Sequence, residues 1–246
     1  MASILCLAIF WGINQVLLAC FGAFVKDHLP DSGILFVQGS MALGGIGIFF
    51  GAMYAGKVSR GYIETGVIPV ATLGIAACLY LLPTLSHEWS ICALFLIYGF
   101  FGGLLIVPLN ALIQFNAEKK ELGKVLSANN FIQNISMLGF LIATIIATKL
   151  NLASEYLLLS LAVIASIGCV VSLLKLPQSL TRYIIYFIAS KFYRVEVDGL
   201  DNMPAKGGIL LLGNHVSFVD WALLQIASPR PIRFVMERSI YEKWYL

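Results

Sequence analysis

The chain has 246 residues, of which 59% are hydrophobic and only 12% are charged, and its mean hydropathy is +0.88. Soluble domains carry about 25% charged residues, so this composition excludes a soluble globular protein. The net charge of +3 is small and dispersed, which excludes a nucleic-acid-binding protein because such proteins carry a basic stripe. Charged residues number 15 in the first 175 positions and 14 in the last 71. We therefore expect two domains, 1–176 and 177–246.

Six charge-free runs occupy the first domain. They cover residues 1–25, 32–56, 65–87, 89–117, 125–148 and 156–174. About 20 apolar residues in a helix cross the hydrocarbon core of a bilayer, so the runs predict six transmembrane helices. All five cysteines lie in this domain without a CxxC pair or a neighbouring histidine, which argues against a metal site.

Lys and Arg in the connections predict the orientation of these helices. The successive connections carry one, two, none, three, one and four such residues. Because positive residues are retained on the cytoplasmic side, this alternation places both chain ends in the cytoplasm. The second domain is then cytoplasmic.

Small and amide side chains mark the interior of the membrane domain. Gly47, Gly51 and Ala55 recur every four residues, which favours close helix packing over a direct ligand role. A buried amide must find a partner in a bilayer, so the amides should face another helix or an aqueous cavity. Interhelical hydrogen bonds and a substrate-lining face both remain open. The candidate cavity residues are Asn110, Gln114, Asn130, Gln133 and Asn134, with Asn129 beside them.

The junction and the second domain have a different pattern. Residues 183–190 form an apolar run that is too short to span, and it suits either an interfacial helix or a buried helix of the second domain. Residues 194–198, 209–213 and 232–236 read as strands, and a helix is expected after Asp220. This order predicts the start of an α/β domain.

His215 and Asp220 carry the chemical hypothesis. A strand ending at Gly213 would deliver His215 to the carboxyl edge of a sheet, where α/β proteins bind ligands. A neutral imidazole can accept a proton from an alcohol, and a carboxylate on its other nitrogen stabilises the imidazolium. The alternative is that Ser217 and Asp220 are ordinary residues at a helix N-terminus. Arg230, Arg233 and Arg238 could approach a phosphate, although solvated surface charge is the favoured interpretation.

The membrane domain resembles the major facilitator superfamily. The connection from Gly51 to Gly61, with Lys57 and Arg60, is similar to the loop between the second and third helices of that family, without its preferred acidic residue. Six helices with both ends inside resemble one half of the twelve-helix facilitator fold. The attached cytoplasmic domain implies the C-terminal half, with the first half missing from this chain.

The second domain resembles the glycerophospholipid acyltransferase (PlsC-like) family. Its first motif, N-H-x4-D, corresponds to Asn214, His215 and Asp220. The resemblance implies that His215 is the general base on a glycerol hydroxyl and that Asp220 supports it, with Asn214 and Ser217 as secondary substrate contacts. The later E-G-T-R-like block has no counterpart, so we expect the remainder of the acyltransferase domain to be absent.

The order of the two domains resembles bacterial fusions of a lysophospholipid transporter with an acyltransferase. The resemblance implies a multi-pass protein of the bacterial inner membrane that re-esterifies lysophospholipid. It further implies acyl-acyl carrier protein or acyl-CoA as co-substrate, no bound cofactor, no metal, and lysophospholipid and membrane lipid as partners. The alternative is a facilitator-type transporter whose soluble domain is degenerate or accessory.

Overall fold

The computed structural model describes residues 1–59, 62–199, 202–204, 207–214, 216–217, 219–228, 230, 232–235 and 238. The chain divides into two compact units, Met1–Leu180 and Thr181–Leu246. The division falls four residues after the predicted boundary at residue 176.

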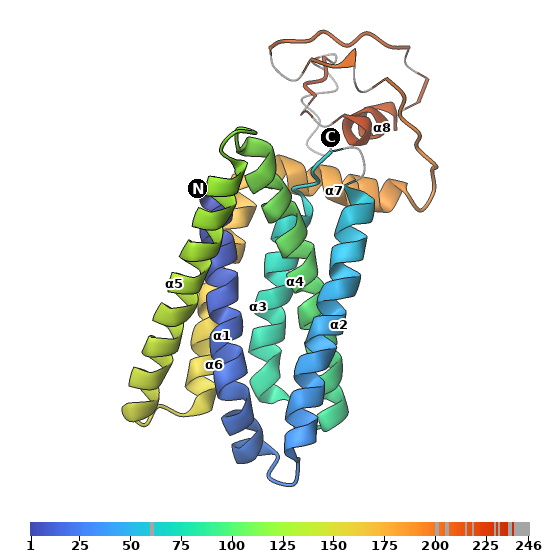
Figure 1. The fold of residues 1–246 in the computed structure, drawn as a ribbon. Helices are drawn as coiled ribbons and strands as arrows, with labels where there is room; N and C mark the ends of the chain where they lie inside the picture. Colours follow the sequence, from blue (N-terminus) through green and yellow to red (C-terminus); the bar gives the residue numbers. More distant parts are fainter. Residues whose placement is uncertain are drawn as a thin grey trace. The chain divides into compact units, whose positions relative to one another are not determined.

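Six long helices make up the first unit, and each is long and apolar enough to cross a membrane (Figure 1). They are α1 (Ala2–His28), α2 (Ile34–Val58), α3 (Val67–Leu81), α4 (Glu88–Asn116), α5 (Leu122–Lys149) and α6 (Ser154–Lys175). A 3-10 turn, η1 (Leu82–Thr84), prolongs α3. Each helix coincides with one predicted run to within a few residues, so the prediction of six transmembrane helices is confirmed. The start of α1 and the end of α6 lie at the same end of the bundle.

The helix contacts repeat with an internal symmetry. The strongest pairs are α2 with α4 and α1 with α5, and exchanging α1–α3 for α4–α6 converts one pair into the other. The same exchange relates the α3–α4 pair to the α1–α6 pair, and it leaves the α3–α6 and α1–α4 pairs unchanged. The bundle is therefore two three-helix repeats, the arrangement found within each half of facilitator-type transporters.

Glycines bring the backbones of α2 and α4 into direct contact. A Cβ added at Gly51 would lie 2.0 Å from the carbonyl oxygen of Phe100, and one at Gly99 would lie 2.0 Å from that of Gly44. Gly47 and Gly103 meet the opposite backbone in the same way. The ladder predicted in α2 is thus a packing surface. Its partner is a second ladder in α4, formed by Gly99 and Gly103.

Two helices are described in or beside the second unit. A single residue separates α6 from helix α7 (Pro177–Ala189). The first four residues of α7 belong to the first unit. Helix α8 (Asp220–Ala227) follows the N-H-x4-D segment and confirms the helix predicted there.

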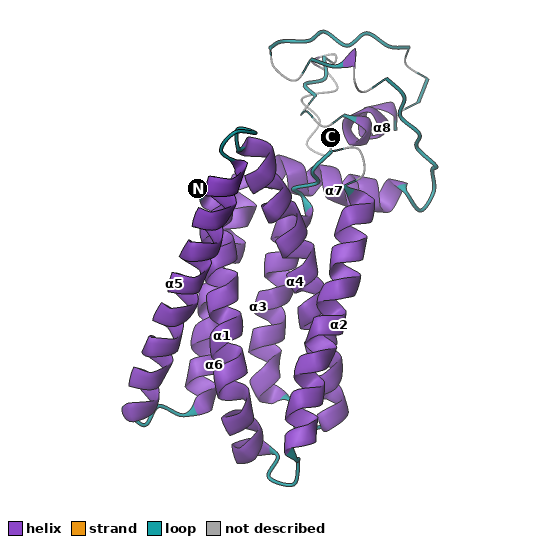
Figure 2. Ribbon diagram, in the orientation of Figure 1, coloured by secondary structure: helices purple, strands orange, loops and turns teal. Residues whose placement is uncertain are grey.

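The strands predicted at 194–198, 209–213 and 232–236 are not seen in the described part of the second unit, which is drawn mostly as loop between its helices (Figure 2). A strand exists only when its N–H and C=O groups pair with a neighbouring strand. The backbone hydrogen bonds found among the described residues include none that joins these segments. The expected sheet is therefore absent from the described residues.

Candidate functional site

The predicted amide side chains on α5 differ in their exposure. Asn129 is 2% exposed and Gln133 is half-buried, whereas Asn130 and Asn134 are exposed. On the side that faces α1, Ser136 donates a hydrogen bond of 2.8 Å to the carbonyl oxygen of Ala8. The contact with α1 is made by a hydroxyl, whereas Oδ1 of the buried Asn129 finds no hydrogen-bond partner among the described residues, so both interpretations of the amides stay open.

The two amides on α4 do not join this stripe. Asn110 donates to the carbonyl oxygen of Ile106 within its own helix at 3.0 Å, and Gln114 is exposed. Helices α4 and α5 contact each other only slightly. The five predicted cavity residues are therefore not gathered around one cavity by the described residues.

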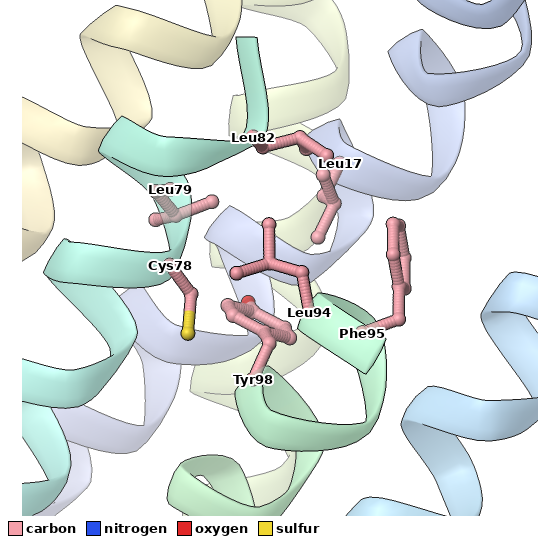
Figure 3. A pocket seen from close by; sticks show the side chains of 7 residues that line it. All are labelled: Leu17, Cys78, Leu79, Leu82, Leu94, Phe95 and Tyr98. Carbon is pink, nitrogen blue, oxygen red and sulfur yellow. The ribbon is translucent and has the colours of Figure 1, made fainter. Parts of the chain in front are cut away.

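A small cavity lies within the apolar core of the bundle (Figure 3). Its volume is about 10 Å³, and Leu17, Cys78 and Tyr98 are among the side chains around it. The hydroxyl of Tyr98 is buried and finds no hydrogen-bond partner among the described residues. A cavity of this size holds at most one water molecule, so it cannot receive a substrate.

Polar contacts join α1 to α6 at the end of the bundle away from the N-terminus. His28 bonds through Nε2 to Glu155, and its ring stacks on Phe24 with 4.3 Å between the centroids. Ser154 donates to Asp27 at 3.4 Å. These contacts fix the ends of two helices and join residues that lie 127 positions apart in the chain.

A buried carboxylate closes the connection between α2 and α3. Glu64 is 1% exposed, and its carboxylate accepts hydrogen bonds from the N–H of Gly66 at 2.9 Å and from the hydroxyl of Tyr62 at 3.2 Å. A negative charge is favourable beside the N-terminus of a helix, here α3. The resemblance had marked the absence of an acidic residue near Gly56, whereas the structure places a buried one eight residues later. Arg60 and Gly61 of that connection lie outside the described residues.

Asp220 turns its carboxylate back toward the N-H-x4-D segment. Its Oδ2 accepts the N–H groups of Val216 at 2.7 Å and of Ser217 at 2.8 Å. The N–H of Asp220 in turn donates to the carbonyl oxygen of Ser217 at 3.1 Å. The loop is thus closed on itself, and the carboxylate lies against the backbone that directly follows position 215.

His215 itself lies outside the described residues, while Asn214 and Ser217 are exposed. Helix α8 is capped by Val219 without a side-chain hydrogen bond. The bonds from the carboxylate of Asp220 to residues 216 and 217 close the turn before α8, as the structural interpretation expects, and the catalytic interpretation depends on His215.

Arg230 links the loop before the N-H-x4-D segment to the residues after α8. Its guanidinium donates to the carbonyl oxygens of Pro204 at 2.8 Å and Gly207 at 2.5 Å, while its N–H donates to the hydroxyl of Ser228 at 3.1 Å. It therefore ties the turn before the N-H-x4-D segment to the residues that follow α8. This role is neither the phosphate contact nor the solvated charge considered from the sequence.

Comparison with known proteins assigns both parts of the chain. Residues 1–140 match the Major Facilitator Superfamily, and this match covers more than half of the chain. The chain belongs to the major facilitator superfamily. Residues 194–246 of this facilitator match the Acyltransferase family, and the matched segment contains Asn214, His215 and Asp220. No solved structure matches the chain.

The facilitator chain is thus a multi-pass membrane protein that combines a transporter-type bundle with an acyltransferase segment. Helix α7 precedes the acyltransferase match and follows the last spanning helix. The one histidine within residues 194–246 of the sequence is His215.

Proposed function

We propose that the protein transfers an acyl group from a thioester to the free hydroxyl of a lysophospholipid. The observation that carries this proposal is the carboxylate of Asp220, which is held against the backbone next to His215 within the segment that matches the acyltransferases. Acyl-acyl carrier protein or acyl-CoA supplies the acyl group, and the reaction requires neither a metal nor a bound cofactor.

The chemistry assigned to the pair is a balanced acyl transfer. His215 accepts the proton of the glycerol hydroxyl while the oxygen attacks the thioester carbonyl, which forms a tetrahedral intermediate. The attack forms the C–O bond of the ester. Collapse of the intermediate restores the carbonyl double bond and breaks the C–S bond, and the imidazolium gives its proton to the departing thiolate. Asp220 stabilises the imidazolium, while Asn214 and Ser217 provide secondary contacts to the substrate.

The proposal also assigns a place to each domain. Residues 1–176 form a facilitator half in the bacterial inner membrane that delivers lysophospholipid, and residues 177–246 belong to a cytoplasmic acyltransferase domain. The distribution of Lys and Arg among the connections supports an orientation with both ends in the cytoplasm. Transport would be completed by the other half of the facilitator fold, and catalysis by the rest of the acyltransferase domain.

A second function is lysophospholipid transport with a purely accessory soluble domain. The facilitator match over residues 1–140 and the exposed amides Asn130 and Asn134 favour this alternative. Both functions can be measured in one preparation, because uptake into proteoliposomes does not require an acyl donor.

The test replaces His215 with Ala in a protein that contains this chain together with both completed domains, reconstituted into proteoliposomes. Labelled acyl transfer to lysophosphatidylethanolamine should fall by roughly 100-fold or more, because general base catalysis contributes about that much. His87, in the connection before α4, gives the matched control as His87→Ala and should leave transfer unchanged. Undiminished transfer in His215→Ala would overturn the catalytic assignment, and intact uptake without any transfer in the unmodified protein would favour the transporter alternative.

A further inference from the structure

We infer that the segment at the end of α7 binds the phosphate headgroup of a lysophospholipid while the acyl chain stays in the membrane. The site is a cavity of about 450 Å³ between the end of α7, the residues that follow it, and Ile226 of α8. This inference rests on the proposed function for the identity of the lipid. It assigns a binding site outside the N-H-x4-D motif.

Chain connectivity places α7 at the membrane surface. Helix α6 ends at Lys175 and α7 begins at Pro177, so a single residue separates a spanning helix from the next one. Thr65, which lies just before α3, donates a hydrogen bond of 2.9 Å to Ser179 and holds the first turn of α7 at the end of the bundle. With 13 residues α7 is too short to cross a bilayer.

The two faces of α7 differ in the way that an interfacial helix requires. Arg182, Tyr183 and Ala189 are buried. Ile184, Phe187 and Ile188 are 45%, 48% and 55% exposed, and their spacing of three and four residues puts them on one face. An apolar face on a helix at the bilayer surface is covered by acyl chains. The junction helix thus combines both interpretations left open by the sequence, with one face for lipid and one for the protein.

The lining of the cavity suits a phosphate. Lys191 and Arg194 provide two positive charges, and Tyr186, Ser190 and Tyr193 provide hydroxyl groups. The described residues of the lining include no carboxylate. The cavity is open to solvent, and the side chain of Arg194 is 91% exposed. The positive charges and hydroxyl groups of the lining therefore favour a phosphodiester headgroup.

Lys191 and Arg194 lie just after the apolar face of α7, where they can bind a lipid phosphate. The ammonium group of Lys191 lies 5.2 Å from the ring centroid of Phe187, so the charge sits directly beside a lipid-facing side chain. Arg194 pairs through Nε with Glu196 at 3.0 Å. A guanidinium has five N–H donors, so Arg194 can bind a phosphate without giving up this pair. A lipid whose tail lies along Phe187 would thus bring its phosphate to Lys191 and Arg194.

The experiment captures lipid at the cavity. The protein carries p-benzoylphenylalanine in place of Phe192, a lining residue, and is reconstituted with radiolabelled lysophosphatidylethanolamine before irradiation. We expect labelling that falls about 100-fold in Lys191→Gln/Arg194→Gln, because each of the two charge-assisted bonds contributes at least about 1.4 kcal/mol, the energy of a tenfold change. The charge-matched control Lys149→Gln/Arg233→Gln removes two exposed cations elsewhere and should label like the unmodified protein.

Competitors separate the sources of the phosphate. Unlabelled lysophosphatidylethanolamine should abolish capture, whereas glycerophosphoethanolamine and inorganic phosphate should compete weakly because neither has a tail. Equal competition by inorganic phosphate would overturn the lipid assignment, and so would equal labelling of both double variants. Capture needs neither an acyl donor nor His215, so the assay repeated in His215→Ala keeps a failure of this inference distinct from a failure of the proposed function.

Discussion

Different kinds of contact stabilise the two units of the molecule, each within itself. In the bundle, α2 and α4 touch through their backbones, and a Cβ at Gly51 or Gly99 would lie 2.0 Å from a carbonyl oxygen of the other helix. In the second unit, Arg230 and Asp220 join loops through bonds between a charged side chain and the backbone. Lipid is as apolar as the helices, so association in the bilayer depends on close packing. Substitutions that enlarge a side chain should therefore destabilise the first unit most, and substitutions that remove a charge should destabilise the second.

The largest expected effect on stability is at Gly51. Gly51→Ala forces a methyl group against the carbonyl oxygen of Phe100 and should destabilise the bundle by about 3 kcal/mol, the upper part of the range for overpacking. Gly45→Ala is the matched control, since no atom lies within 4 Å of its added Cβ. Both variants can be compared by thermal unfolding in the same detergent. If the two variants unfold together, the backbone contact between α2 and α4 does not limit stability.

A smaller effect is expected at Arg230. Arg230→Ala removes the bonds to the carbonyl oxygens of Pro204 and Gly207 and should loosen the second unit by about 1–2 kcal/mol. Amide hydrogen exchange should rise around residues 202–208 without change in the bundle. Arg233→Ala, at an exposed arginine nearby, is the control. Faster exchange that spread equally through α2 and α4 would contradict the independence of the two units.

The membrane architecture could be predicted because the bilayer imposes it on the sequence. Each spanning helix needs about 20 apolar residues, so the charge-free runs located all six helices. The partners of these helices could not be read in the same way. Gly99 and Gly103 are two of the 22 glycines, and only the structure shows that they face the ladder of α2. Burial of Glu64 and the bond between His28 and Glu155 likewise depend on residues that the fold brings together.

In the candidate site, too, contacts between residues far apart in the chain could not be predicted from the sequence. The spacing of His215 and Asp220 predicted a carboxylate close to the imidazole. The structure shows the carboxylate of Asp220 bonded to the backbone of residues 216 and 217, while His215 lies outside the described residues. Apolar alternation at 194–198 predicted a strand, but alternation does not supply the neighbour with which a strand must pair. Arg230 could not be assigned from the sequence because its acceptors are backbone carbonyls 23 and 26 residues away.

The central proposal is that Asp220 supports acyl transfer through His215. The most direct measurement is the rate of acyl transfer to lysophosphatidylethanolamine by Asp220→Asn, which preserves the shape of the side chain and removes its charge. Asp198→Asn, at an exposed aspartate of the same unit, is the control. We predict a loss of roughly 100-fold or more for Asp220→Asn with unchanged thermal unfolding of the helix bundle, and no loss for Asp198→Asn. Equal rates for the two variants would contradict the account.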